Sequence, residues 1–399
     1  MTDFSELEDR LARVAVEYAA NIQPDQVVIV NCDYGQHGLA RAVARHAYRR
    51  GARFVDVQYF DPHLKRARIE HAAEETLDYV PPWYGQRVLE VDELAGARIS
   101  LSGSTSPGLL DDLDPRRLSR DLLPRVKESF EVINRGRVNW LVLPGPTEGW
   151  ARQVFPDDPE PLARLWEQIA HVCRLDESDP VEAWRERFAV TAGVGERLTA
   201  LRLDAVHFEG PGTDLTVGLF PSSLWENARD RTKRGVEFVA NLPSEELTAT
   251  PDPARTEGVV RSTRPLVLSD GTLIDGIEVR FEEGRAVSVE AETGGDALQG
   301  RTSMDEGARR LGEVALVDRE GRIGPLGTVF YDTLIDENAA SHLAFGGAYE
   351  SLVGEEDVGK INRSGLHLDF MIGSDEVDVT GIAADGTRVP VLRGGTWQV

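Results

Sequence analysis

Hydrophobic and polar positions in the first half of the chain follow two periods, one typical of helices and one typical of strands. Helical spacing predicts helices over residues 7–21, 38–50 and 116–134. Short apolar or alternating runs predict strands at 26–31 (QVVIVN), 53–59 (RFVDVQY), 97–103 (ARISLSG) and 140–143 (WLVL). Strands separated by helices form a mainly parallel sheet that is covered on both faces. The first half is therefore predicted to be an α/β domain.

The pattern changes after two further helices, predicted over residues 159–174 and 180–201. From Asp204 onward the chain consists of short alternating segments, and the Asp270-Gly271 and Glu283-Gly284 pairs are typical of hairpin turns. This pattern predicts a β-rich α+β domain. We place the boundary near residue 200, so that residues 1–200 form the N-terminal α/β domain and residues 201–399 form the C-terminal domain.

The net charge of −24 argues against a nucleic-acid partner, because an acidic surface repels a phosphate backbone. No apolar run approaches the roughly 20 residues that cross a bilayer. The N-terminal segment MTDFSELEDRLARVAVEY has the pattern of an acidic amphipathic helix and lacks that of a signal peptide. We therefore expect a cytoplasmic protein that is not a membrane protein. Cys32 and Cys173 fit no zinc or disulfide pattern, so each is expected to be a small core residue.

The sharpest chemical signal is the segment His367-Leu368-Asp369. Side chains two residues apart on a strand point to the same face, so this imidazole and this carboxylate could bind one metal ion. Apolar residues at positions 366, 368, 370 and 372 would anchor the opposite face. The alternative is a His and an Asp on the solvent face of an edge strand, since the motif is short.

Two other stretches place carboxylates in unusual settings. Glu245 and Glu246 follow the strand-like segment GVEFVA, and they could serve as a metal ligand and a general base; alternatively, Ser244 caps a helix whose first turn favours acids. Glu313 lies in the apolar segment LGEVALV, where a charge needs a partner such as a metal ion. If residues 304–317 are helical, Glu306 and Glu313 share one face.

The segment from Asp336 to Tyr349 contains Glu337 and His342, which are further candidates for metal binding or proton transfer. A helix would place His342 and Tyr349 on one face, although two adjacent glycines at 346 and 347 weaken that prediction. The alternative is a hydrogen-bonded core histidine. Taken alone, these residues indicate a metal site built from carboxylates and histidines.

Four segments, in order, resemble the M29 family of thermophilic, aminopeptidase T-like metallo-aminopeptidases. They are NLPSEELTATPDPARTEGVV, DEGARRLGEVALV, TVFYDTLIDENAASHLAFGGAY and NRSGLHLDFMIGS. The opening LARVAVEYAANIQPDQVVIV and the closing DGTRVPVLRGGTW are also similar to this family, so the resemblance covers nearly the whole chain.

The resemblance implies a cytoplasmic homodimer that removes N-terminal residues from peptides, with two divalent ions in a C-terminal catalytic metallopeptidase domain. The implied metal ligands are Glu246, Glu313, His342, His367 and Asp369. Tyr349 is implied near the reacting group. By analogy with other dinuclear peptidases that have paired glutamates, Glu245 is assigned as a general base, with Glu337 as a second candidate. Zinc, cobalt, manganese and magnesium all fit mixed oxygen and nitrogen ligands.

Two other functions stay open. An Fe(II)-dependent ring-cleaving dioxygenase on the same scaffold has a related C-terminal His-x-Asp, but a mononuclear iron site needs fewer carboxylates than this chain offers. A non-catalytic binding protein that retains the fold is the third hypothesis.

Overall fold

The computed structural model describes residues 3–121, 123–124, 126–268 and 272–399, and it divides the chain into two compact units. The first unit comprises Met1–Arg185 and Arg229–Pro243, and the second comprises Glu186–Ala228 and Ser244–Val399. The division falls within helix α9 (Pro180–Ala200), whereas the boundary predicted from the sequence lies at the end of that helix. The predicted Asp270-Gly271 turn lies outside the described residues.

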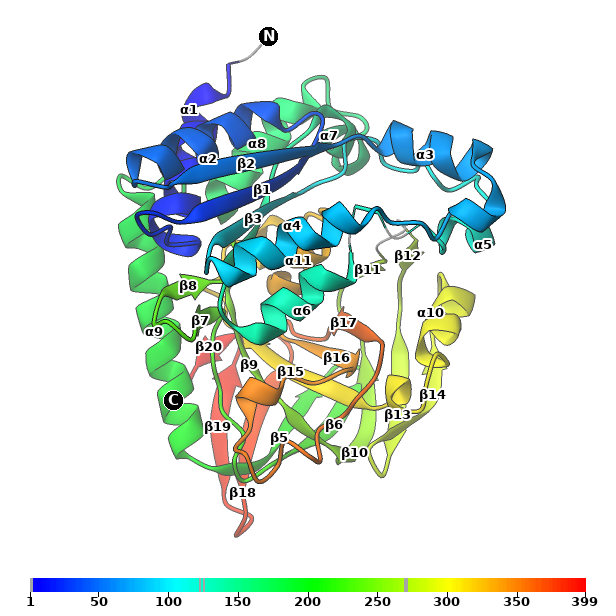
Figure 1. The fold of residues 1–399 in the computed structure, drawn as a ribbon. Coiled ribbons are helices and arrows are strands. Elements are labelled where there is room, and N and C mark those ends of the chain that lie inside the picture. Colours follow the sequence, from blue (N-terminus) through cyan, green and yellow to red (C-terminus); the bar gives the residue numbers. More distant parts are fainter. Residues whose placement is uncertain (1–2, 122, 125, 269–271) are drawn as a thin grey trace. The chain divides into compact units, whose positions relative to one another are not determined.

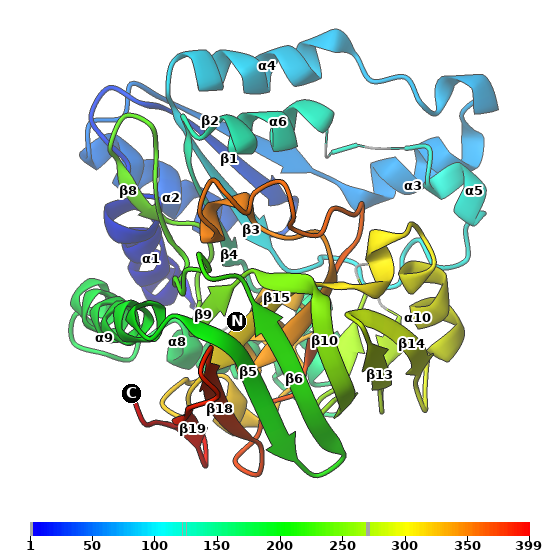
Figure 2. The same ribbon diagram turned by 90° about the horizontal axis from the view of Figure 1, so that it is seen from below.

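Four parallel strands form the sheet of the first unit, in the order β2-β1-β3-β4 (Figure 1). They are β1 (Val27–Asp33), β2 (Phe54–Phe60), β3 (Ala97–Ser102) and β4 (Asn139–Pro144). Helices α1 and α2 lie on one face of this sheet, and α4 and α6 lie on the other (Figures 1 and 2). The helices are α1 (Ser5–Val14), α2 (His37–Arg49), α3 (Pro62–His71), α4 (Pro82–Glu93), α5 (Pro115–Leu118), α6 (Lys127–Arg135), α7 (Glu148–Val154) and α8 (Pro161–Val172). The predicted α/β class with a parallel sheet is confirmed.

Two features of this unit differ from the prediction. The single helix predicted over residues 116–134 is wrong, because the chain forms the two helices α5 and α6, and Pro124, which lacks a backbone N–H, lies between them. The hairpin of β7 (Arg229–Arg231) and β8 (Glu237–Val239) returns to this unit late in the chain. The segment that follows β8 is hydrogen-bonded to β4. The N–H of Val142 in β4 donates to the carbonyl of Ala240 at 2.9 Å, and the N–H of Leu242 donates to the carbonyl of Val142 at 3.0 Å.

The second unit contains two antiparallel sheets with the orders β14-β13-β10-β6-β5-β18-β19-β20 and β17-β16-β15-β9. The strands of the larger sheet are β5 (Leu203–Gly210), β6 (Thr213–Leu219), β10 (Pro251–Arg261), β13 (Glu278–Glu282), β14 (Arg285–Glu290), β18 (Asp378–Ala383), β19 (Arg388–Arg393) and β20 (Thr396–Trp397). Those of the smaller sheet are β9 (Glu246–Ala249), β15 (Leu311–Val317), β16 (His342–Gly346) and β17 (His367–Met371). The unit also contains the β11 (Leu266–Val267) and β12 (Leu273–Ile274) pair and helices α10 (Gly295–Thr302) and α11 (Thr333–Asp336). The predicted β-rich class is confirmed, as is the hairpin at Glu283-Gly284, where both residues have positive φ.

The core of the second unit lies between its two sheets. One buried apolar cluster combines residues from both of them. Phe281 of β13 stacks on Phe345 of β16 with ring centroids 6.0 Å apart, and Phe345 stacks on Phe370 of β17 at 5.0 Å. Because side chains alternate along a strand, anchoring one face of the smaller sheet in this core directs every second side chain to the opposite face.

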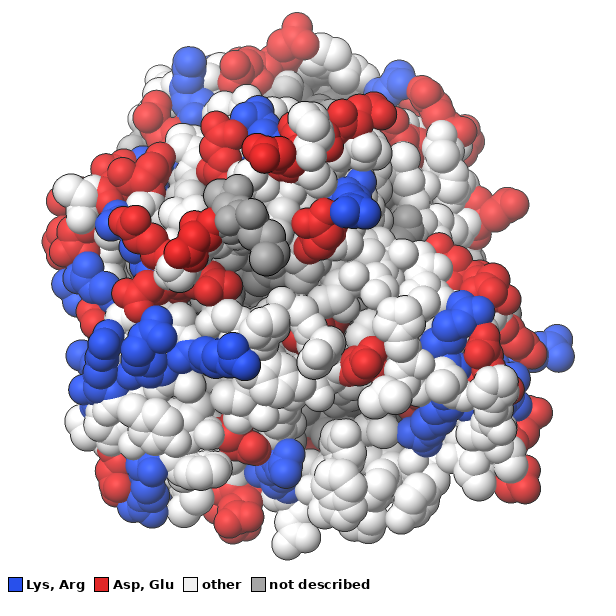
Figure 3. Space-filling view, turned by 90° about the horizontal axis from the view of Figure 1, so that it is seen from above, with Lys and Arg blue, Asp and Glu red and all other residues white. Residues whose placement is uncertain are grey.

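Other expectations from composition can be compared with the structure. Cys32 and Cys173 are both buried, as predicted for small core residues. Among the described residues, no helix has the length and apolar character needed to cross a membrane. Acidic and basic side chains are interspersed on the face shown in Figure 3.

Candidate metal centre

The five predicted metal ligands all lie on the smaller sheet of the second unit, and strand pairing places them on one face. Glu246 begins β9, Glu313 lies in β15, His342 begins β16, and His367 and Asp369 belong to β17. Glu313 pairs with Ala344, which pairs with Asp369, and this gives a row across three strands. Directly paired residues, and residues two apart on one strand, project to the same side of a sheet. The opposite side carries the apolar residues of the core.

Three local predictions are wrong because these segments are strands. Glu313 is not on a helix with Glu306, since it lies within β15. Glu246 begins a strand instead of a helix capped by Ser244. His342 begins β16, so it does not share a helical face with Tyr349. In each segment, cross-strand hydrogen bonds and burial on the core side outweigh the local pattern.

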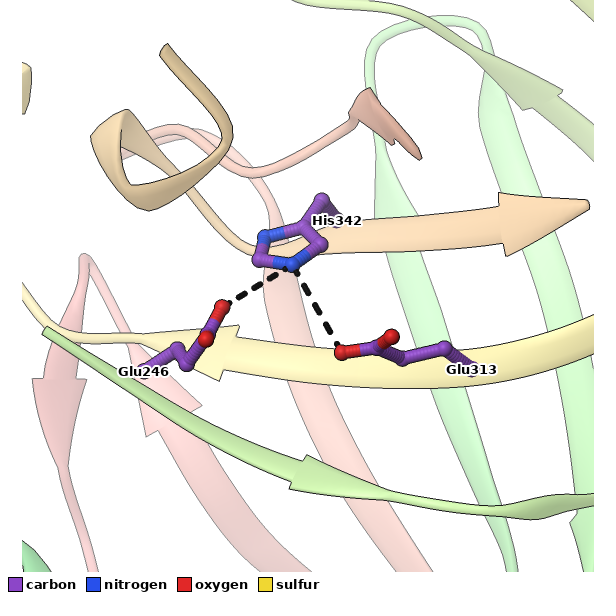
Figure 4. A group of neighbouring side chains, drawn as sticks. All are labelled: Glu246, Glu313 and His342. Carbon is purple, nitrogen blue, oxygen red and sulfur yellow. Dashed lines mark ion pairs between the residues drawn. The ribbon is translucent and has the colours of Figure 1, made fainter. Parts of the chain in front are cut away.

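Glu246, Glu313 and His342 form the first group that could hold a metal ion (Figure 4). Each offers one ligand atom, and these atoms lie within 4.8 Å of one another. His342 Nε2 is 3.1 Å from Glu246 Oε2 and 3.9 Å from Glu313 Oε1. All three residues are buried, and His342 is only 1 % exposed. The first group is therefore shielded from bulk water.

Glu313, His367 and Asp369 form the second group, with the same 4.8 Å limit between ligand atoms. His367 Nε2 is 3.2 Å from Glu313 Oε2 and 3.6 Å from Asp369 Oδ1. Glu313 is thus shared by the two groups, and each of its carboxylate oxygens faces a different histidine. The side chain of His367 is 32 % exposed, so solvent reaches the site on this side.

Neighbouring groups orient the ligands. His342 Nδ1 donates to the carbonyl of Ala340 at 3.0 Å, and His367 Nδ1 donates to that of Gly347 at 2.9 Å. Both histidines are therefore held with Nε2 toward the carboxylates, as expected when a second partner fixes the tautomer of a metal ligand. The hydroxyl of Thr248 donates to Glu313 Oε1 at 2.6 Å. Thr248 was not predicted from the sequence, although it lies two residues after Glu246 on the same face.

The carboxylates dominate the electrostatics of the site. Burial lowers the pKa of His342, but Glu246, Asp369 and Glu313 outweigh this effect and raise the pKa to about 10. In the same way Asp369 and Glu313 overcome the burial of His367 and raise its pKa to about 12. Without a metal, both imidazoles are therefore cations that compensate the carboxylates, and a bound cation would take over this role.

The environment of one Glu246 oxygen also fits a bound metal ion. Glu246 Oε2 is buried and meets full hydrogen-bond geometry with no described donor, and the imidazole nitrogen beside it is His342 Nε2 at 3.1 Å. A buried carboxylate oxygen that meets its partner in poor geometry is incompletely satisfied, and a divalent cation between Glu246 and His342 would satisfy it. The donor set of carboxylate oxygens and imidazole nitrogens matches the ligands of zinc and related metals. The residues therefore fit the metal centre implied by the sequence.

Glu337 and Tyr349 lie next to the two groups. Glu337 is half-buried at the end of α11; burial and the charges of Asp369 and Glu246 raise its pKa well above the usual value. Tyr349 is 46 % exposed, and its hydroxyl lies 3.4 Å from His367 Nε2. The Tyr349 hydroxyl is thus placed at the edge of the site that is open to solvent.

Glu245 has a different environment. Its side chain is 1 % exposed, and Arg187 Nε donates to Glu245 Oε2 at 2.6 Å. Arg187 also binds Asp318, and the backbone N–H of Glu245 donates to Asn338 Oδ1 at 2.7 Å. Arg187 and Asp318 lie outside the segments that resemble the family, and Asn338 lies inside one but has no ionisable side chain, so none of the three was predicted from the sequence. This geometry does not support Glu245 as the general base.

A cavity of about 140 Å³ adjoins the second metal-binding group. His367 and Asp369 line one side of it, and Arg301 and Thr333 also contribute. The rest of the lining is apolar: Leu266, Val267, Leu268, Leu366 and Leu368. A small apolar side chain that enters this cavity would lie directly beside the metal ligands.

Comparison with known proteins supports the interpretation of this site. The family model described as thermophilic metalloprotease (M29) matches residues 4–397. Aminopeptidase T of Thermus thermophilus is 42% identical, and aminopeptidase AmpS of Bacillus subtilis is 35% identical. Each of these alignments covers 100% of both chains.

The solved structures give the same result. AmpT from Thermus thermophilus superposes with a TM-score of 0.92 at 41% identity and full coverage of both chains. A 2,5-dihydroxypyridine dioxygenase from Pseudomonas putida superposes with a TM-score of 0.54 over 100% of this chain and 98% of its own, but at 12% identity this similarity concerns the fold alone. The chain belongs to the M29 family of thermophilic metalloproteases.

Proposed function

We propose that this chain removes N-terminal amino acids from peptides with water activated by two divalent ions. The coarser assignment is a metal-dependent aminopeptidase. It follows from the family and from aminopeptidase relatives that align with this chain over their whole length. The observation that carries the finer proposal is the position of Glu313, whose two oxygens face His342 and His367. A carboxylate shared between two ligand groups is the arrangement expected of a bridging ligand.

Charge balance also supports two ions. With both histidines neutral, the carboxylates of Glu246, Glu313 and Asp369 carry three negative charges, one more than a single divalent cation neutralises. A single ion would leave an excess negative charge at a largely buried site, and such a charge is costly. The identity of the metal is not fixed by these ligands, and zinc, cobalt, manganese and magnesium are the candidates.

When bound, the ions would supply two kinds of chemistry, a lowered pKa for a water molecule and polarisation of the scissile carbonyl. We assign Glu337 the transfer of the proton from water to the leaving amine, because burial and the neighbouring carboxylates of Asp369 and Glu246 raise its pKa well above the usual value. Tyr349 is assigned as a hydrogen-bond donor to the tetrahedral intermediate, since its hydroxyl lies beside His367.

The substrate enters from the side of His367 and Tyr349, where the site is open to solvent. The proposal places the first side chain of the substrate in the apolar cavity beside His367 and Asp369. A free α-amine in its neutral form could serve as a further nitrogen ligand to a bound divalent ion, which favours a free N-terminus. Assembly as a homodimer and a cytoplasmic location remain part of the proposal.

A comparison of two leucyl substrates tests this function. The purified protein is treated with a chelator, reloaded with each of the four metals, and assayed with leucine p-nitroanilide and with its N-acetylated form. We expect metal-dependent release of nitroaniline from the free-amine substrate only. A reloaded protein that cleaves neither compound nor short peptides, or that cleaves both compounds equally, would contradict the proposal.

A further inference from the structure

A buried arginine joins segments that adjoin the metal ligands. Arg187 of α9 is 8 % exposed, and it donates from Nε to Glu245 Oε2 at 2.6 Å. Its other two nitrogens contact Asp318, with Nη2 at 2.5 Å from Oδ1 and Nη1 at 3.2 Å from Oδ2. This two-point contact uses the planar fork of the guanidinium, which a lysine cannot reproduce. Both carboxylates are buried.

The partners of Arg187 mark the ends of two ligand-bearing strands. Glu245 immediately precedes Glu246, the first residue of β9, and Asp318 immediately follows Val317, the last residue of β15. Val317 and Glu246 are paired across the two strands. Arg187 therefore connects the start of β9, where Glu246 lies, to the end of β15.

A second connection runs to Glu337. The backbone N–H of Glu245 donates to Asn338 Oδ1 at 2.7 Å, and Asn338 Nδ2 donates to the carbonyl of Leu334 at 3.2 Å. Asn338 is fully buried and follows Glu337 directly. The position of Glu245 thus fixes the backbone of the segment that presents Glu337 to the ligands.

Stability alone does not explain this network. A buried cluster of one arginine and two carboxylates carries a large desolvation cost, and replacing such clusters by apolar residues is often neutral or stabilising. A network of this kind does, however, specify one geometry of the groups that it connects. Partners behind metal ligands commonly change metal affinity when they are removed.

We propose that Arg187, acting through Glu245, Asp318 and Asn338, is a positioning residue that holds the carboxylates of Glu246 and Glu337 in the geometry that binds metal. The inference rests on the proposed function, because it assumes that the Glu246 group binds a divalent ion. Glu245 then acts as the ion-pair partner of Arg187 and is not the general base.

Cobalt titration of the chelated protein tests the role of Arg187, with the visible absorption of bound Co(II) as the readout. The variants are Arg187→Met and, as a matched control on the same helix, Arg185→Met, which removes an exposed partner of Glu182. We expect Arg187→Met to bind Co(II) about 10- to 100-fold more weakly and with a changed spectrum, and Arg185→Met to match the wild type. Arg187→Met that binds Co(II) like the wild type would overturn the proposal, even if its Tm falls.

Glu245→Gln provides a second test in case Arg187→Met does not fold. The glutamine oxygen still accepts from Arg187, so we expect Co(II) affinity and kcat to fall less than about tenfold, whereas loss of a general base costs about 10²–10⁴ in kcat. A loss of kcat in that range with unchanged Co(II) binding would overturn the proposal in favour of a general-base role. A wild-type protein that binds no Co(II), zinc or manganese would instead refute the proposed function itself.

Discussion

Glu245 and Glu246 are adjacent in the chain, but their carboxylates have different partners. Glu246 Oε2 lies 3.1 Å from His342 Nε2, in the first metal-binding group, while Glu245 Oε2 accepts from Arg187 at 2.6 Å. The two carboxylates therefore separate into a member of the candidate metal centre and a member of a buried ion pair. This separation moves the general-base role to Glu337 in our account.

Replacing Glu337 tests that assignment. Glu337→Gln keeps the size of the side chain but cannot accept a proton, so we expect kcat for leucine p-nitroanilide to fall by about 10²–10⁴. Steady-state kinetics at saturating metal measures this change. Glu320→Gln, which alters an exposed glutamate of the same unit, is the control and should retain wild-type kcat. A kcat for Glu337→Gln within twofold of the wild type would remove Glu337 from the mechanism.

Ala344 separates Glu313 from Asp369 in the row across β15, β16 and β17. Its small side chain leaves space on the ligand face, so Ala344→Val is expected to weaken Co(II) binding by about tenfold or more through overpacking of the ligands. Ala249→Val is the matched control, because Ala249 is buried in the same sheet but belongs to the apolar core. The control should lower Tm without changing Co(II) affinity. Equal Co(II) affinities in the two variants would contradict this account of the ligand face.

Metal loading is expected to release protons. In the metal-free protein the pKa values of His342 and His367 are raised to about 10 and about 12, so both imidazoles are protonated at neutral pH. A metal binds only the neutral imidazole, and each histidine must therefore lose one proton. Calorimetric zinc titrations at pH 7.5 in buffers of different ionisation enthalpy should show about two protons released per chain, with affinity rising as pH rises. Loading without proton release would show that the histidines are not ligands.

The cavity beside His367 and Asp369 predicts a preference for apolar N-terminal residues. Val267→Phe would reduce its volume of about 140 Å³. We expect kcat/KM for leucine p-nitroanilide to fall at least about tenfold while the value for the alanine compound changes little, because each methylene group that an apolar pocket accepts or rejects is worth about 1–3 kcal/mol. An equal decrease for both substrates would place the substrate side chain elsewhere.

Part of the site was predictable because strand periodicity is a local property. The alternation around His367 and Asp369 correctly placed both side chains on one face, and the apolar surroundings of Glu313 correctly indicated a charge with a partner. The helix predicted for Glu306 and Glu313 failed because a short segment with helical spacing can pair as a strand when its neighbours bury one face. The sequence alone does not specify those neighbours.

Arg187 shows what the sequence could not indicate. It lies in a long helix, far along the chain from Glu245 and Asp318, and only the packing of the second unit brings the three side chains together. The hairpin of β7 and β8 is a similar case in the fold. Its residues 229–243 follow part of the second unit in sequence but belong to the first, because backbone hydrogen bonds join them to β4. Both features depend on contacts between distant segments.

If Glu313 is shared by two metal ions, its removal should deprive both ligand groups of a ligand, and metal analysis of Glu313→Ala measures this loss. Wild-type protein and the variant are loaded with zinc, passed through a desalting column and analysed by mass spectrometry of the metal. Glu306→Ala serves as the control, since Glu306 is exposed and lies outside both ligand groups. We expect two zinc ions per chain in the wild type and the control, and fewer than one in Glu313→Ala. Two ions retained by Glu313→Ala, or a single ion in the wild type, would contradict it.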